Sequence, residues 1–137
     1  MKAVIQRVSS AKVVAEGVLT GEIGQGLMIL LGVVEEDTKK HAKVMAEKIA
    51  NLRIFRDEND KMNLSLLDIG GQALAVSNFT LCADTSHGRR PSFIAAKNPQ
   101  EANELYEYFM ECLRGEGVSK VDAGVFGAHM DVTIEND

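Results

Sequence analysis

The stretch Leu27-Met28-Ile29-Leu30-Leu31-Gly32-Val33-Val34 is the longest apolar run of the chain, and it decides the fold class. Because no polar residue alternates within it, the strand that it predicts should be buried on both faces. Such a strand needs a layer of other elements on each side. The run is far shorter than the ~20 residues that cross a membrane, so a transmembrane span is excluded.

Shorter elements are expected on either side of this strand. Before it, the pattern predicts strands at Ala3–Val8 and Ala11–Val18, with Ser9-Ser10 as the turn between them. After it, Asp37 is the candidate N-cap of a first helix. The apolar positions of that helix follow helical spacing: Ala42, Met45, Ala46, Ile49 and Leu52.

The second half of the chain predicts a hairpin, a strand and a longer helix. The hairpin joins Arg53–Phe55 to Met62–Leu64, and the strand runs from Ala73 to Leu81. The helix starts at Asn98-Pro99-Gln100-Glu101, which combines an Asn cap, Pro at the first helical position and Glu three residues after the cap. Its inward positions are expected to be Ala102, Leu105, Tyr106, Phe109 and Leu113, and Gly115 is expected to end it.

Two separated helices among many strands predict the α+β class. Short strands near Val118–Val121 and Met130–Ile134 complete the chain. We expect curved antiparallel or mixed β-sheets, barrel-like, with the two α-helices packed on them.

Composition narrows the class of protein. The 137 residues fit one domain, residues 1–137, and 15 Lys+Arg against 20 Asp+Glu give a net charge of −5. That charge argues against a protein that coats nucleic acid. Because Gln6 and Arg7 interrupt the apolar start, no secretory signal is indicated, and we expect a soluble, cytoplasmic protein.

Metal and thiol chemistry is not indicated. The three histidines are far apart in the sequence and lack paired metal-ligand spacing, so a surface position is expected for each: His41, His87 and His129. Two cysteines, Cys82 and Cys112, cannot make a four-ligand zinc site by themselves and fit small core residues. No metal and no cofactor is therefore expected.

Two regions have residue types that suit chemistry. In a strand, Asn78 and Thr80 of Ser77-Asn78-Phe79-Thr80-Leu81 would share one face and one polar pocket, or they would simply face water at a sheet edge. The segment from Ser86 to Lys97 has three positive charges and no acid, so it is either a surface loop or a local clamp for phosphates.

These segments resemble the D-aminoacyl-tRNA deacylases over nearly the whole chain. Besides Ser77–Leu81, the resemblance rests on five segments in one order: Gln6-Arg7-Val8, Gly21-Glu22-Ile23-Gly24, Arg53-Ile54-Phe55 with Lys61-Met62-Asn63, Gly88-Arg89-Arg90-Pro91-Ser92-Phe93, and Gly124-Val125-Phe126-Gly127-Ala128-His129-Met130. It implies a homodimeric hydrolase with its site at the subunit interface and no cofactor. The implied reaction is hydrolysis of the ester that joins a D-amino acid, or glycine mischarged on tRNA-Ala, to the 3′-terminal adenosine of tRNA.

The resemblance also assigns roles to residues. It implies a catalytic segment of Ser77, Asn78, Phe79 and Thr80, and substrate contacts by Arg7, Arg89, Arg90, Phe126 and Met130. Asn78 departs from the Gln usual at that position, and its amide is one methylene shorter. The family's C-terminal Asn-x-Gly-Pro-x-Thr signature, which is implied to select chirality, is present here only as Asn136-Asp137.

Three hypotheses about function follow. In the favoured one, water attacks the activated ester, backbone N–H groups near Phe79 and Thr80 stabilise the oxyanion, and the ribose 2′-hydroxyl assists. Thr80 as a covalent nucleophile is the alternative mechanism. The other two functions are a non-catalytic RNA-end-binding module and a small-molecule-binding α+β oligomer.

Overall fold

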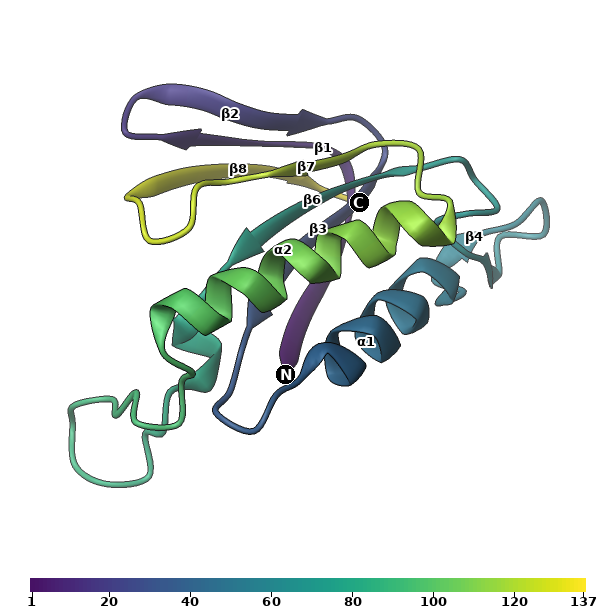
Figure 1. The fold of residues 1–137 in the computed structure, drawn as a ribbon. Coiled ribbons are helices and arrows are strands. Elements are labelled where there is room, and N and C mark those ends of the chain that lie inside the picture. The colour runs from purple at the N-terminus through teal and green to yellow at the C-terminus, as the bar shows by residue number, and fades with distance from the viewer.

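The computed structural model describes residues 1–137, and its chain forms a mixed sheet with two helices on one side (Figure 1). The elements are β1 (Lys2–Ala15), β2 (Val18–Ile23), β3 (Gly26–Gly32), α1 (Lys39–Asn51), β4 (Phe55–Arg56), β5 (Met62–Leu64), β6 (Gln72–Ser77), the 3-10 turn η1 (Phe79–Cys82), α2 (Pro99–Glu116), β7 (Val121–Ala123) and β8 (Met130–Asn136). The α+β class and the hairpin of β4 with β5 are confirmed.

The main sheet has the order β2-β1-β3-β6-β7, and β8 pairs with β1. The first half of β1 pairs with β3, and its second half pairs with both β2 and β8. The pairs β3–β6 and β6–β7 are parallel, whereas the pairs made by β1 are antiparallel. The outer strands β2 and β7 then approach each other, because Glu22 N–H donates to Asp122 Oδ2 at 2.9 Å and Lys120 Nζ donates to Glu22 O at 2.7 Å. The sheet is therefore nearly closed, as the barrel-like expectation required.

Most of the apolar run Leu27–Val34 lies in β3, which is buried on both faces, as predicted. Leu27, Ile29 and Leu31 join the core that lies between the sheet and the helices. Met28 points the other way, into a smaller core inside the curved sheet. The two layers that this strand needs are thus the helix pair and the returning strands β1 and β8.

The expected turn at Ser9-Ser10 is wrong, since β1 runs without a break to Ala15. A register shift against β8 occurs there, and the hydroxyl of Ser10 donates to Glu135 Oε2 at 2.6 Å. The turn comes later, at Glu16-Gly17, where both residues have positive φ. A partner strand distant in sequence therefore keeps the two serines in extended structure.

Three element ends also differ from the prediction. Thr38, and not Asp37, is the N-cap of α1. Helix α2 starts at Asn98-Pro99 as predicted, with Asn98 Oδ1 accepting from Glu101 N–H at 3.0 Å, but it ends at Gly117, in the left-handed region with φ of 106°, and not at Gly115. The strand expected to reach Leu81 stops at Ser77, and η1 follows it.

Helix α2 is hydrogen-bonded to β6, the strand that ends at Ser77. The buried hydroxyl of Tyr106 donates to the carbonyl of Ala75 on β6 at 2.6 Å, and burial raises the pKa of Tyr106 well above its ordinary value. Because burial favours the neutral phenol, the stabilisation that Tyr106 provides is present below about pH 10 and falls as the pH rises further.

We expect Tyr106→Phe to lower the free energy of unfolding by about 1 kcal/mol, because Ala75 O loses its short hydrogen bond but still accepts a longer one from Gly124 N–H. Urea denaturation at pH 7 measures this change. Tyr108→Phe on the same helix is the matched control, because the centroid of its ring lies 5.0 Å from Lys39 Nζ on α1 and its hydroxyl makes no hydrogen bond to β6. Equal effects of the two variants would contradict the anchoring role of Tyr106.

Candidate functional site

A pocket of about 740 Å³ opens where β3 and β6 end. Its walls come from the ends of these strands, the segment before α2, the first turn of α2, and the segment between β7 and β8. Five of the residues predicted from the sequence line it: Ser77, Asn78, Phe79, Phe126 and Met130. Segments far apart in the sequence therefore meet in one cavity.

The signature residues lie on a turn and not on a continuing strand. Asn78 N–H donates to Leu31 O at 2.8 Å, which is the last ladder bond between the β6 segment and β3. The chain then enters η1, where Asn78 Oδ1 caps the turn by accepting from Thr80 N–H at 3.0 Å. The predicted alternation of Asn78 and Thr80 on one strand face is wrong for this reason, and Thr80 is exposed outside the pocket wall.

This cap decides which hydrogen-bond donors remain for a ligand. Phe79 N–H is the first amide of η1 and has no acceptor within the turn. Asn78 Nδ2 makes no hydrogen bond within the protein, while Oδ1 of the same side chain is engaged with Thr80. Two residues of the pocket wall thus retain a donor without an acceptor, Phe79 its backbone amide and Asn78 its side-chain amide, whereas Thr80 N–H is already occupied.

Gly32 allows η1 to lie close to the end of β3. A Cβ at this position would be 2.9 Å from Leu81 Cβ, 3.1 Å from Cys82 Sγ and 3.2 Å from Asn78 O. The buried Cys82 thiol contacts Val33 O at 3.5 Å on the same side, and burial raises the pKa of this thiol. Cys82 is therefore a packing residue beneath the turn, as its sequence context predicted.

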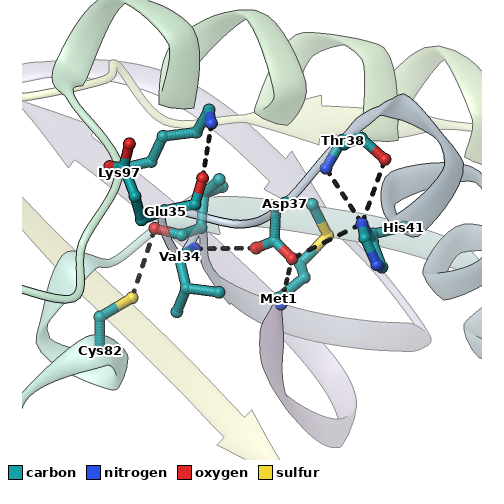
Figure 2. Close-up of polar contacts among 9 residues, drawn as sticks. Met1, Val34, Glu35, Asp37, Thr38, His41, Cys82 and Lys97 are labelled. Atoms are coloured by element: carbon teal, nitrogen blue, oxygen red, sulfur yellow. Dashed lines mark hydrogen bonds and ion pairs between the residues drawn. The ribbon is translucent and has the colours of Figure 1, made fainter.

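A polar cluster holds the segment that follows β3 (Figure 2). The α-amino nitrogen of Met1 lies 2.6 Å from Asp37 Oδ1, and Val34 N–H donates to Asp37 Oδ2 at 2.8 Å. Lys97, whose side chain lines the pocket, donates from Nζ to Glu35 O at 2.8 Å. Asp37 thus fixes the 33–37 turn, which explains why it does not cap α1.

The basic segment is a loop that extends beyond the body of the molecule, before α2 (Figure 1). Two hydrogen bonds between Asp84 and Ser92, of 2.8 and 2.9 Å, close its base. The Ser86 hydroxyl and amide lower the pKa of the Asp84 carboxyl. Arg89 and Arg90 are exposed, lie outside the pocket wall and make no ion pair.

Arg7 lies away from the pocket. Its Nη1 donates to Ile54 O at 2.7 Å, and its Nη2 donates to Asp137 O at 3.1 Å. The guanidinium therefore joins β1 to the β4 region and to the last residue of the chain. The structure brings five predicted residues together and leaves Arg7, Thr80, Arg89 and Arg90 outside the wall.

The lining residues that were not predicted from the sequence as part of the site include one aromatic residue and two basic ones: Phe93, Lys97 and His129. Phe93 packs edge-to-face against Phe79, with ring centroids 4.7 Å apart. Both Phe93 and Lys97 lie in the positively charged segment from Ser86 to Lys97, and His129 immediately precedes Met130. Proximity to those residues was the available signal, but no pattern of spacing separates them from ordinary loop residues.

Comparison with known proteins agrees with this arrangement of segments. The family described as D-Tyr-tRNA(Tyr) deacylase matches residues 4–137. The chain belongs to this family. A D-aminoacyl-tRNA deacylase of Deinococcus deserti is 56% identical over 137 residues, which cover 100% of this chain and 93% of the relative. A D-aminoacyl-tRNA deacylase of Koribacter versatilis is 53% identical over 137 residues, which cover 100% of this chain and 91% of that relative.

Solved structures show the same fold. The structure titled c-Myc DNA unwinding element binding protein has a TM-score of 0.93 and 41% identity, and the match covers 100% of this chain and 93% of that one. A probable eukaryotic D-amino acid tRNA deacylase has a TM-score of 0.84 at 16% identity, covering 98% and 93%, and supports the fold alone. In this deacylase-family chain no helix is both long and apolar enough to cross a membrane.

We expect Gly32→Ala to destabilise the protein by about 1–3 kcal/mol, because backbone and Cβ atoms of η1 must shift. Hydrogen exchange at the amides of Asn78 and Leu81 should accelerate with it. Gly115→Ala is the matched control: its Cβ meets nothing within 4 Å in helix α2, and it should stabilise by up to about 1 kcal/mol. If Gly32→Ala leaves both stability and exchange unchanged, the close approach of η1 to the end of β3 does not require glycine at this position.

Proposed function

We propose that this protein hydrolyses the ester bond of D-aminoacyl-tRNA, releasing the free D-amino acid and tRNA. The observation that carries the proposal is the turn after β6, where Ser77, Asn78 and Phe79 line the pocket and the amides of Asn78 Nδ2 and Phe79 N–H are unbonded, in a chain of the deacylase family. The 137 residues act as one deacylase domain in the cytoplasm. No metal or organic cofactor is required, because an aminoacyl ester is already activated.

The proposed reaction is a direct attack by water. The water oxygen adds to the ester carbonyl carbon, and the carbonyl oxygen becomes an oxyanion held by Phe79 N–H and Asn78 Nδ2. The bond from carbon to the ribose 3′-oxygen then breaks. The neighbouring ribose 2′-hydroxyl relays the proton from the attacking water to that leaving oxygen.

Thr80 is a positioning residue in this mechanism. Its side chain is exposed outside the pocket wall, and no hydrogen bond joins its hydroxyl to a His, Asp or Glu side chain that could act as base. Its backbone amide, however, fixes the side chain of Asn78. Covalent catalysis by Thr80 is the alternative, and it requires the turn to rearrange.

The rest of the substrate is placed by the other predicted residues. Phe126 and Met130 contact the 3′-terminal adenosine, since both line the same pocket as the signature turn. Arg89 and Arg90 contact phosphates outside it. Arg7, which holds Ile54 and Asp137, supports the substrate site from a distance and does not touch the ligand in this arrangement.

A second copy of the chain completes the site in our proposal. One pocket wall includes half-buried apolar side chains of β3 and β8, Leu30, Met130 and Val132, and a partner subunit would cover them. Rigid backbone at the interface would exclude L-aminoacyl esters, whereas a glycyl ester has no side chain to clash. Glycine mischarged on tRNA-Ala is therefore a second substrate.

A deacylation assay tests this function. We expect the protein to release amino acid from D-Tyr-tRNA and Gly-tRNA-Ala and to leave L-Tyr-tRNA intact, with sedimentation showing a dimer. Tight binding of both tyrosyl-tRNAs without turnover would instead support an RNA-end-binding module. Absence of both binding and turnover would support a small-molecule-binding oligomer.

Asn78→Asp isolates the side-chain donor. The variant keeps the oxygen that accepts from Thr80 N–H, but a carboxylate oxygen replaces Nδ2. We expect kcat to fall by about 10²–10³, the usual effect of removing one oxyanion donor, with little change in KM. Thr80→Ala is the control and should retain measurable turnover. Loss of activity in Thr80→Ala with an active Asn78→Asp would reverse the two roles.

A further inference from the structure

The rim of the pocket carries an exposed apolar surface that the proposed reaction does not use. Phe79 is 61% exposed, although aromatic rings usually bury most of their surface. Phe93 is half-buried and packs edge-to-face against it, with an interplanar angle of 64°. Ile94, the next residue, is 92% exposed.

The segment that contains Phe93 is positively charged. The segment from Ser86 to Lys97 contains Arg89 and Arg90 and has no acidic residue, in a chain whose net charge is −5. Neither arginine has a carboxylate partner, whereas Lys97 forms an ion pair with Glu101 at 3.3 Å. Two free guanidinium groups therefore lie on the loop that leads directly into Phe93.

Exposed aromatic rings beside unpaired arginines are suited to single-stranded nucleic acid. Bases stack on aromatic side chains, and basic groups follow the phosphates, with little preference for base identity. Both rings line the pocket, so a strand whose last nucleoside occupies the pocket can stack its preceding base on this rim. The combination of positive charge with exposed aromatic surface favours RNA over a purely apolar protein partner.

We propose that Phe79 and Phe93 form a stacking platform for the nucleotide that precedes the terminal adenosine, while Arg89 and Arg90 hold its phosphates. This inference rests on the proposed function and extends it to the single-stranded end of the tRNA. Because stacking tolerates any base, one platform serves every tRNA species, and the substrate class includes any RNA whose unpaired 3′ end carries the aminoacyl ester.

Two esters separate the platform from the pocket: D-Tyr-tRNA and 2′(3′)-O-D-tyrosyl-adenosine, which lacks the preceding nucleotide. The measured quantity is the ratio of kcat/KM for the tRNA to kcat/KM for the adenosine ester. We expect Phe93→Leu to lower this ratio roughly tenfold, within the range for one stacked base. Phe93→Trp should preserve the ratio, because it keeps an aromatic ring.

Ile94→Ser is the matched control for the exposed apolar surface, and it should leave both the ratio and the sedimentation coefficient unchanged. An unchanged ratio in Phe93→Leu would overturn the proposal, since the ring would then serve only the pocket. A change of oligomeric state in Ile94→Ser, together with a lower ratio, would overturn it in favour of a second protein copy on this surface.

Binding distinguishes failure of the platform from failure of the proposed function. If the unaltered protein hydrolyses neither ester, the proposed function fails. An RNA oligonucleotide that ends in CCA and carries no amino acid still tests the platform. We expect Phe93→Leu to bind it about tenfold more weakly than the unaltered protein and Phe93→Trp to bind it equally well. Equal binding by all three proteins would overturn the platform by itself.

Discussion

The parallel pairing of β3 with β6 is the constraint on which the site depends. Its last bond, from Asn78 N–H to Leu31 O, sets the point at which the chain leaves the sheet and enters η1. Because β7 is parallel to β6, the segments that follow all three strands emerge at one edge of the sheet. Loop residues from three distant parts of the sequence therefore surround one pocket there, as is usual at the carboxyl ends of parallel strands.

Charge is divided so that an acidic protein can approach a polyanion in one orientation. Exposed glutamates lie along α2, whereas the segment before it, from Ser86 to Lys97, carries Arg89 and Arg90 and has no acidic residue. Phosphates are repelled by much of the surface and attracted at the loop. A net charge of −5 is therefore compatible with contact to the end of one RNA strand through this loop.

Local patterns predicted what local interactions determine. The apolar run around Leu31 and the cap Asn98-Pro99 were both recognised, since burial and capping depend on residues close in sequence. The missed features depend on distant partners: β8 keeps Ser9-Ser10 extended, and Met1 draws Asp37 away from the helix terminus. The pocket contributions of Phe93 and Lys97 required the fold, because no spacing rule joins them to β6.

Asn78 shows how a shorter side chain can change which atoms face a ligand. An Asn oxygen reaches the amide two residues ahead and closes a tight turn, as it does here with Thr80 N–H. The Gln that the resemblance implies at this position has one more methylene, so it would not close the same turn with the same geometry. Asn78 occupies one backbone donor by capping it, but the fixed amide leaves its own Nδ2 unbonded beside Phe79 N–H. The turn therefore keeps two donors at the pocket wall even though Thr80 N–H is no longer one of them.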